Sequence, residues 1–327
     1  MQLHTGLASV FPRSEALVAA TRDFDRGRTT ADALEELYAR TEAEVVALEE
    51  RLGFDTRTAG YLRWQDLFRP FAETWDGFTV GPVTRWFQTN TFFRRPVLHT
   101  PPERRPGEFA ARIPKPLTGP GAATAKVLLP GPYTFAGLLD NRSGEPDSAL
   151  IHRIGRLLAE EVKELRGKGY RTFQFQEPLL ADRPPEGVAA ESVLAAYQSV
   201  AHQLSGGTSI VWTYHGDGAV VAPLLARLSV GVVGVDLAET DVAKLPIALE
   251  HKGIGLGVVD PRTTLVEEAG EVARIVRSVR DRLHPSSIWL SHGAPIDLLP
   301  WEPATRKLHA LPAARQLLAG PDGGGRP

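Results

Sequence analysis

The stretch that decides the fold is Ser209-Ile-Val-Trp-Thr-Tyr-His-Gly-Asp217, an apolar run that ends abruptly in polar residues. A second stretch, Ser287-Ile-Trp-Leu-Ser-His-Gly293, ends in the same way, and the apolar run at 230–235 between them ends in Asp236. An α/β barrel places its active site at the C-terminal ends of successive buried strands. The pattern therefore predicts a barrel whose mouth carries His215, Asp236 and His292, two imidazoles and a carboxylate that form a metal-ligand set.

Short β-branched runs alternate with longer amphipathic segments along most of the chain, which is typical of βαβ units around a parallel sheet. Eight strands are predicted, at residues 3–9, 56–61, 126–129, 172–175, 209–213, 231–235, 254–258 and 287–290. The predicted fold class is therefore α/β, a (β/α)8 TIM barrel forming a single domain over residues 1–319, with a disordered tail at 320–327. A doubly wound open sheet is the rival fold, but it needs a Gly-rich phosphate turn after an early strand, and residues 7–11 do not supply one.

Two additions to the barrel are expected. A helical hairpin is predicted at 14–26 and 30–52, with Thr30 as an N-cap. Residues 78–116 have alternating patterns and Pro-rich joints, which predict a small antiparallel insertion. Within it, the aromatic and basic stretch 85–95 either covers a flat ligand or packs as a hairpin on the barrel. Further helices are predicted at 65–74, 148–167, 190–203, 219–227, 242–251, 265–283 and 301–318.

Composition narrows the class of protein. The 327 residues are 43% hydrophobic and carry a net charge of −2, which argues against nucleic acid or an anionic membrane as the main partner. No apolar stretch is long enough to span a membrane, and the N-terminus lacks the pattern of a signal peptide, so a soluble cytoplasmic enzyme is expected. The chain has no cysteine, so any metal must be held by His, Asp or Glu.

Other polar residues stand at or near predicted strand ends. Ser9 ends the first strand, Asp66 lies near the second, and Gln176-Glu177 ends the fourth, followed by Pro178. Glu177 is interpreted as a carboxylate that orients a substrate ammonium or accepts a proton, or else as one half of an ion pair at the barrel mouth. For either histidine taken alone, the alternative is a rim residue hydrogen-bonded to a loop.

Together, the order and spacing of several motifs resemble the catalytic domain of cobalamin-independent methionine synthase. The motifs are Ser9-Val-Phe-Pro-Arg13, Gly60 with Asp66, Gly131-Pro-Tyr-Thr134, Gln174-Phe-Gln-Glu-Pro178, Tyr214-His-Gly216, Val235-Asp-Leu237, Gly257-Val-Val-Asp260 and Ser291-His-Gly293. The resemblance implies a zinc-binding barrel that moves a methyl group from a 5-methyltetrahydrofolate donor to homocysteine without cobalamin. It also implies that this chain is a single-barrel member of that family.

The resemblance assigns roles to individual residues. The family's metal-ligand positions fall on Thr213, His215, Asp236 and His292, with both family cysteines replaced by histidine. The set left here, His215, Asp236 and His292, is compatible with zinc, and also with ferrous iron, manganese or cobalt. Substrate-binding positions are implied at Ser9, Asp66, Gln176 and Glu177. The family's proton donor falls on Arg262, and a guanidinium cannot give up a proton near neutral pH.

The function expected from the resemblance is that of a metal-dependent S-methyltransferase acting on a thiol amino acid and a methylated folate. Two alternatives stay open. One is a lyase like the uroporphyrinogen decarboxylases, for which Arg13, Arg63 and Arg262 would be the arginines of the mouth. The other is a non-catalytic relative that binds no metal.

Overall fold

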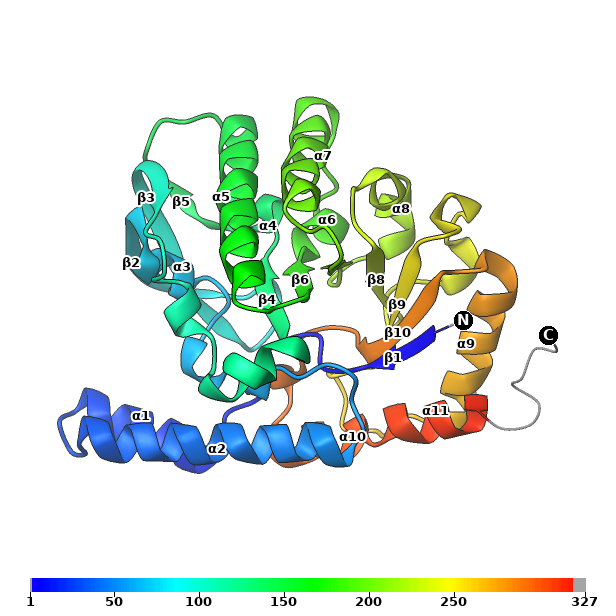
Figure 1. The fold of residues 1–327 in the computed structure, drawn as a ribbon, viewed down its shortest axis with the longest axis horizontal. Coiled ribbons are helices and arrows are strands. Elements are labelled where there is room, and N and C mark those ends of the chain that lie inside the picture. The colour runs from blue at the N-terminus through cyan, green and yellow to red at the C-terminus, as the bar shows by residue number, and fades with distance from the viewer. Residues whose placement is uncertain (1, 320–327) are drawn as a thin grey trace.

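The computed structural model describes residues 2–319 and shows an α/β fold built on one curled sheet of seven parallel strands (Figure 1). The strands are β1 (Gln2–Thr5), β4 (Lys126–Pro130), β6 (Thr172–Gln176), β7 (Thr208–Trp212), β8 (Val232–Asp236), β9 (Gly253–Val259) and β10 (Ser287–His292). Their order in the sheet is β1-β10-β9-β8-β7-β6-β4. The six strands from β4 to β10 are almost wholly buried, which explains why their sequences are nearly continuous apolar runs.

The second strand predicted at residues 56–61 is not formed. Residues 59–64 make a 3-10 turn instead, in which Ala59, Gly60 and Tyr61 have φ values of 49°, 72° and 50°. A strand requires extended backbone, so this left-handed run excludes one. Arg57 makes a single bridge to Ala125, before β4, and the Asp55 N–H donates to the carbonyl of Thr5 in β1 at 2.9 Å. Residues 55–57 thus connect the edge strands β1 and β4 through a few hydrogen bonds. The predicted closed barrel of eight strands is not confirmed.

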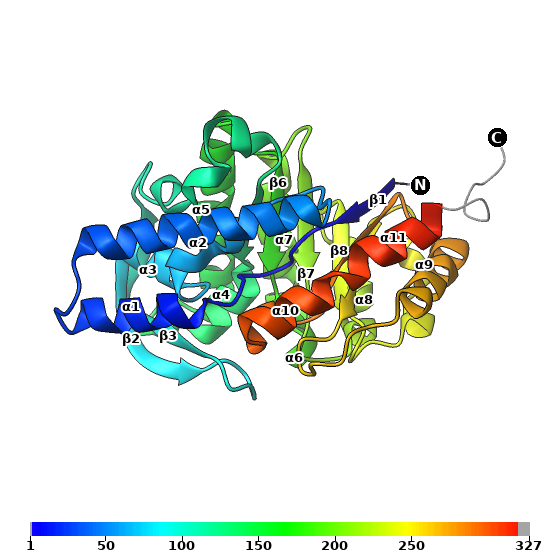
Figure 2. The same ribbon diagram turned by 90° about the horizontal axis from the view of Figure 1, so that it is seen from below.

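Helices cover the sheet on two sides. The helices α5 (Asp147–Gly167), α6 (Pro178–Asp182), α7 (Gly187–His202) and α8 (Gly218–Arg227) form the upper layer of Figure 1, with α4 (Pro132–Leu138) beside them and α9 (Ala269–Leu283) at one edge. The opposite layer holds the helices α1 (Glu15–Asp25), α2 (Ala31–Arg51), α10 (Trp301–Leu308) and α11 (Ala310–Ala319) (Figure 2). The predicted helical hairpin is confirmed, and the side chains of Ser14 and Thr30 cap its two helices.

Three predicted helices differ from those observed. Residues 242–251 form two 3-10 turns, at 242–244 and 247–249, because Pro246 between them has no N–H to donate to a continuous helix. The helix predicted at 301–318 divides at His309 into α10 and α11. The helix α3 (Arg69–Thr74) starts later than predicted, after a turn capped by Asp66. The tail predicted at 320–327 lies outside the described residues.

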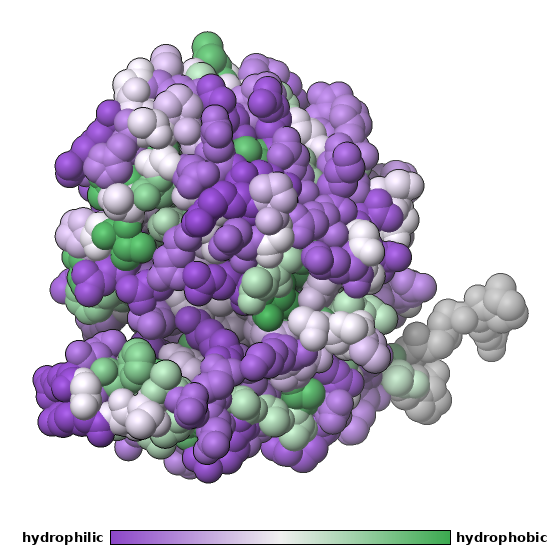
Figure 3. All heavy atoms as spheres, turned by 60° about the vertical axis from the view of Figure 1, so that its left-hand side comes forward, coloured by the Kyte–Doolittle hydropathy of each residue, from purple (hydrophilic) through white to green (hydrophobic). Residues whose placement is uncertain are grey.

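The antiparallel insertion is a hairpin of β2 (Trp75–Arg85) and β3 (Phe92–Arg104), with the short β5 (Asp140–Asn141) alongside β3. Its connecting loop folds over the sheet, and the ring of Phe87 in this loop lies 4.9 Å from the ring of His215. Residues 110–112, within the span predicted for the insertion, form a 3-10 turn. The face shown in Figure 3 is largely hydrophilic, with hydrophobic residues in small separate groups. Within residues 2–319, no helix combines the length and the apolarity that crossing a membrane requires.

Candidate functional site

Three adjoining cavities lie where the strands of the sheet end. The inner cavity, of about 60 Å³, is lined among others by Ser9, Asp66, Gln176, Tyr214 and Asp297. A second cavity of about 530 Å³ shares Val10, Thr91 and Asp297 with the first. A third, of about 500 Å³, is lined by residues of the β2–β3 loop together with His215, Glu239 and Arg262. Of the predicted substrate and metal positions, Ser9, Asp66, Gln176 and His215 therefore line these cavities, whereas Glu177, Asp236 and His292 line none of the three.

Two of the predicted substrate-binding residues hold the walls of the inner cavity. The Ser9 hydroxyl donates to the carbonyl of Val10 at 2.9 Å and accepts the N–H of Ile296 at 3.0 Å. The Asp66 carboxylate accepts three backbone N–H groups, from Phe68, Arg69 and Arg94, at 2.8–3.0 Å. Burial nevertheless raises the pKa of Asp66. Both side chains fix loops around the cavity, and Asp66 joins the start of α3 to the insertion.

Gln176 and Asp297 keep polar atoms available inside the same cavity. Gln176 donates its Nε2 hydrogen to the carbonyl of Ala8, while its Oε1 is buried and has no hydrogen-bond partner among residues 2–319. Asp297 also lines this cavity, and burial raises the pKa of its carboxyl to about 6. Asp297 carried no signal in the sequence, because it follows β10 in a short 3-10 turn rather than ending a strand.

Glu177 is buried and bonded to the protein on both carboxylate oxygens. It accepts the backbone N–H of Tyr133 at 3.1 Å, the N–H and hydroxyl of Thr134 at 2.8 and 2.7 Å, and the hydroxyl of Tyr197 at 3.0 Å. These contacts cap the start of α4 and tie it to the end of β6. Burial outweighs the four donors and raises the pKa of Glu177 to about 7. Its contacts in the structure are those of a residue that holds α4 in place.

Replacing Glu177 by Gln is expected to change how stability depends on pH. A carboxyl whose pKa is raised from 4.5 to about 7 by folding stabilises the fold below pH 4.5, and that contribution is lost as pH rises through 7. The stability of the natural protein relative to Glu177→Gln should therefore fall by roughly 3 kcal/mol between pH 4.5 and pH 8. Urea unfolding across this range measures it. Glu302→Gln, at a side chain that is 81% exposed, is the control, and a Glu177→Gln difference as flat as that control would contradict the assignment.

His292 ends β10 and is fully buried. Its Nε2 accepts the N–H of Ala8 at 2.8 Å, and its Nδ1 lies 2.8 Å from the carbonyl of Ala294, to which it donates. Both ring nitrogens are therefore occupied, and the ring is held as the neutral tautomer that carries its hydrogen on Nδ1. Burial lowers the pKa of His292 to about 3. The side chain joins the loop after β1 to the turn after β10.

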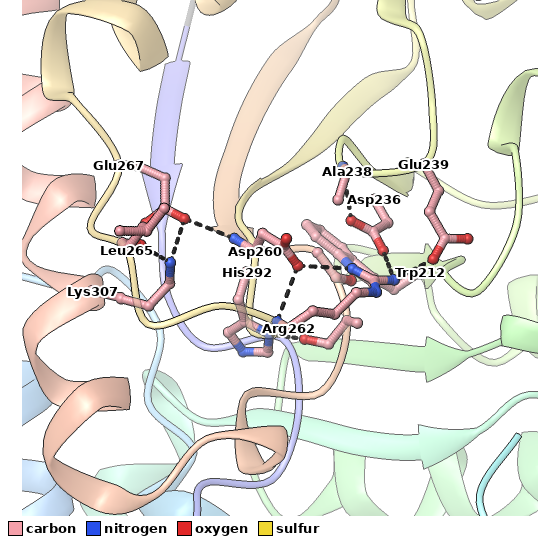
Figure 4. A network of polar contacts seen from close by, with 12 residues as sticks. Trp212, Asp236, Ala238, Glu239, Asp260, Arg262, Leu265, Glu267, His292 and Lys307 are labelled. Atoms are coloured by element: carbon pink, nitrogen blue, oxygen red, sulfur yellow. Dashed lines mark hydrogen bonds and ion pairs between the residues drawn. The ribbon is translucent and has the colours of Figure 1, made fainter. Parts of the chain in front are cut away.

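Asp236, the carboxylate that ends β8, is bonded to Arg262 (Figure 4). The Arg262 Nη2 lies 2.6 Å from Asp236 Oδ2 and 2.6 Å from Glu239 Oε1, and its Nη1 lies 2.9 Å from Asp260 Oδ1. The second oxygen of Asp236 accepts the N–H of Ala238 at 3.1 Å. Burial raises the pKa of Asp236, and the hydrogen bond from Arg262 opposes that shift. The three carboxylates in turn keep Arg262 protonated.

Of the three predicted metal ligands, His215 is the one with an unpaired polar atom among residues 2–319. It follows β7 with a φ of 62°, an uncommon conformation for a residue with a side chain, and its ring packs between Phe87 and Tyr214. Its Nε2 is buried and has no hydrogen-bond partner in the described part of the chain. Burial, helped by the charge of Arg262, lowers the pKa of His215 to about 4, so the ring is neutral near pH 7.

The structure thus brings the predicted residues to one side of the sheet without assembling a metal-ligand set from them. Within residues 2–319, no three His, Asp or Glu side chains form a group that could hold a metal ion. Ser9, Asp66 and Gln176 line the inner cavity, His215 and Arg262 line the third cavity, and Glu177 is fully buried and lines neither.

Comparison with known families and proteins gives a consistent result. Residues 75–284 match the model of the cobalamin-independent synthase N-terminal domain. Over 314 residues the chain is 25% identical to a methionine synthase of Saccharolobus solfataricus, with 94% of this chain and 92% of that protein covered. It is also 25% identical to a 5-methyltetrahydropteroyltriglutamate–homocysteine methyltransferase of Corynebacterium efficiens, of which it spans 43%.

Solved structures share the fold. A B12-independent methionine synthase from Shewanella sp. W3-18-1, in complex with selenomethionine, superposes with a TM-score of 0.74 at 17% identity, covering 97% of this chain and 98% of that one. A putative vitamin-B12 independent methionine synthase from Listeria monocytogenes gives a TM-score of 0.68 at 17% identity over 97% of this chain. At these identities the likeness concerns the arrangement of the backbone.

Proposed function

Because the chain belongs to the cobalamin-independent methionine synthase family, we propose that it transfers a methyl group from a methylated tetrahydrofolate to a thiol amino acid of the homocysteine type. The observation that carries the proposal is the family match over residues 75–284, which include β4 to β9 and the loop above the cavities. The methyl group leaves a donor nitrogen and bonds to the acceptor sulfur. The sulfur loses its proton and the donor nitrogen gains one, so no oxidant or reductant is needed.

The inner cavity suits the amino group of the acceptor. An ammonium group needs hydrogen-bond acceptors and a negative charge. Gln176, with its unpaired Oε1, and Asp297, with its carboxylate, both line this cavity and would supply these, and Ser9 lines it as well. Asp66 and Glu177, also implied as substrate-binding positions, would act here by holding the surrounding loops, because backbone donors occupy their carboxylates.

The third cavity, of about 500 Å³, suits a flat donor. Its lining includes Phe87 and Asn90 of the β2–β3 loop together with His215 and Arg262. An aromatic side chain facing polar groups can stack on a ring such as a pterin while hydrogen bonds fix its orientation. This arrangement supports the reading of residues 85–95 as a ligand cover, and the same segment also packs as a hairpin on the sheet.

A divalent metal on His215, Asp236 and His292 does not fit the arrangement of these side chains. His292 has both ring nitrogens bonded to backbone groups, and Asp236 has both oxygens bonded to Ala238 and Arg262. Of the three, His215 alone has an unpaired ligand atom. Zinc needs at least three such protein ligands around one point. We therefore assign no step of the reaction to a metal ion, whether zinc, iron, manganese or cobalt.

Replacing Asp297 by Asn is expected to weaken acceptor binding selectively. The change removes the negative charge facing the ammonium group, so the dissociation constant for homocysteine should rise about tenfold, which corresponds to about 1.4 kcal/mol. The dissociation constant for 4-mercaptobutyrate, which lacks the amino group, should stay the same. Calorimetric titration of both ligands measures this. Asp281→Asn, at a side chain that is 65% exposed, is the matched control. An equal loss for both ligands would contradict the placement.

The proposed function is tested by incubating the purified protein with 5-methyltetrahydrofolate and a panel of thiols, and analysing the products by mass spectrometry. Methylation of homocysteine in preference to cysteine supports the proposal. The second candidate is a metal-free relative that binds ligands without reaction, which is favoured because His215, Asp236 and His292 form no metal-ligand group within residues 2–319. It predicts stabilisation of the protein by these ligands with no methylated product. We also propose that residues 55–57 close the sheet into a barrel in place of a full eighth strand, since Asp55 bonds to Thr5 in β1 and Arg57 bridges to Ala125, just before β4.

A further inference from the structure

Three carboxylates at the ends of β8 and β9 converge on one guanidinium. Asp236 ends β8, Glu239 follows it by three residues, and Asp260 follows β9. Arg262 reaches all three with two nitrogens, at 2.6, 2.6 and 2.9 Å. The Asp236 side chain is fully buried, whereas the other two carboxylates are about one-third exposed. The buried carboxylate therefore depends on Arg262 for its counter-charge, and water can reach the outer two.

The backbone closes the other side of Asp236. Its Oδ1 accepts the N–H of Ala238, and a Cβ atom added to Gly293 would lie 2.0 Å from the same oxygen. Gly293 belongs to the turn after β10 and packs directly against this carboxylate. A cation that binds Asp236 must therefore approach its Oδ2, and the Arg262 Nη2 occupies that approach.

We infer that the guanidinium of Arg262 is the resident cation of this site, in place of a divalent metal ion. It carries a fixed charge that does not dissociate into solvent, and it neutralises the carboxylate at the end of β8. Three of its five N–H groups are used by the carboxylates, which leaves two for an oxygen atom of a ligand in the adjoining cavity. Arg262 is thus a positioning residue: it holds Asp236, Glu239 and Asp260 in place beside His215.

The inference is tested by metal content and thermal unfolding, which do not depend on methyl transfer. The natural protein is incubated with zinc, desalted and analysed by atomic absorption, and its melting temperature is measured with zinc, with magnesium and with EDTA. The same measurements are made on Arg262→Ala and Arg262→Lys. Arg274→Ala, which breaks the exposed ion pair with Glu271, is the matched control.

The natural protein is expected to retain far less than one equivalent of zinc, and its melting temperature should not respond to metal or EDTA. Arg262→Ala should melt several degrees lower and regain stability when a divalent cation is added, because three carboxylates then converge without a counter-charge. Arg262→Lys should melt between the two. One equivalent of zinc retained by the natural protein would overturn the inference, and so would a melting temperature of Arg262→Ala equal to that of the control. If Arg262→Ala does not fold, the metal content of the natural protein and the melting temperature of Arg262→Lys decide.

Discussion

Gly255→Ala is expected to lower the free energy of unfolding by about 3 kcal/mol, because the added methyl group would overlap a buried tryptophan. Gly255 in β9 and Gly234 in β8 lie against the indole of Trp212, which extends from β7. A Cβ atom at Gly255 would lie 2.4 Å from Trp212 Cζ3 and 2.8 Å from the Cα of Gly234. Neither the ring nor the backbone can move away easily within a sheet whose strands are buried.

The matched control is Gly231→Ala, just before β8, where the nearest atom to the new methyl group would be 3.6 Å away. Urea unfolding of both variants should show a large loss for Gly255→Ala and a change within about 0.5 kcal/mol for Gly231→Ala. Equal losses of unfolding free energy in the two variants would show that overlap with Trp212 is not the reason for the glycine at position 255. The result also bears on the site, since Trp212 donates its indole N–H to the carbonyl of Gly293 at 3.0 Å and Gly293 packs against Asp236.

His292→Ala is expected to lower the free energy of unfolding by about 4 kcal/mol. Removing the imidazole leaves a buried N–H at Ala8 and a buried carbonyl at Ala294 without partners, and it also opens a cavity. The loss of unfolding free energy should be the same with and without added zinc, because both ring nitrogens are already hydrogen-bonded to backbone groups. Chemical unfolding in the presence and absence of zinc measures it.

His309→Ala, at an exposed position between α10 and α11, is the control and should change stability by less than about 0.5 kcal/mol. A His292→Ala variant as stable as this control would contradict the structural role of His292. A loss that appears only when zinc is supplied would instead identify the residue as a metal ligand.

Much of the sheet could be predicted because its strands carry their signal locally. Apolar runs bounded by polar residues predicted the bounds of β7, β8 and β10 to within about two residues. The ends of these strands in turn predicted the side of the sheet on which the cavities lie. Thr30 as an N-cap and the amphipathic run that follows it likewise predicted the helical hairpin, because both lie within one short window of sequence.

The missing second strand depended on contacts distant in sequence. Thr58 and Ala59 donate to the buried carboxylate of Glu49 in α2 at 2.8–3.2 Å, which stabilises a tight turn where the local pattern favours a strand. The predicted metal-ligand set differs from the observed site for a similar reason. Arg262 lies 26 residues from Asp236, and nothing in the spacing showed that its guanidinium binds that carboxylate.

The roles of Glu177 and His292 were also hidden from the sequence. A carboxylate or an imidazole at a strand end can bind a ligand, and it can equally form hydrogen bonds with the protein's own backbone. Only the folded chain shows that Tyr133, Thr134 and Tyr197 donate hydrogen bonds to the Glu177 carboxylate. Likewise, only the folded chain shows that both ring nitrogens of His292 are bonded to the backbone of Ala8 and Ala294. Conversely, Asp297 became a candidate because the turn after β10 brings it to the cavity that Gln176 also lines.

The most direct test of the account is methyl transfer by protein freed of metal. The purified protein is treated with a chelator and desalted, then supplied with homocysteine and with 5-methyltetrahydrofolate that carries an isotope label on its methyl group. Labelled methionine is followed by mass spectrometry, and a parallel sample receives zinc. The account predicts labelled methionine at the same rate in both samples. No labelled methionine in either sample would contradict it.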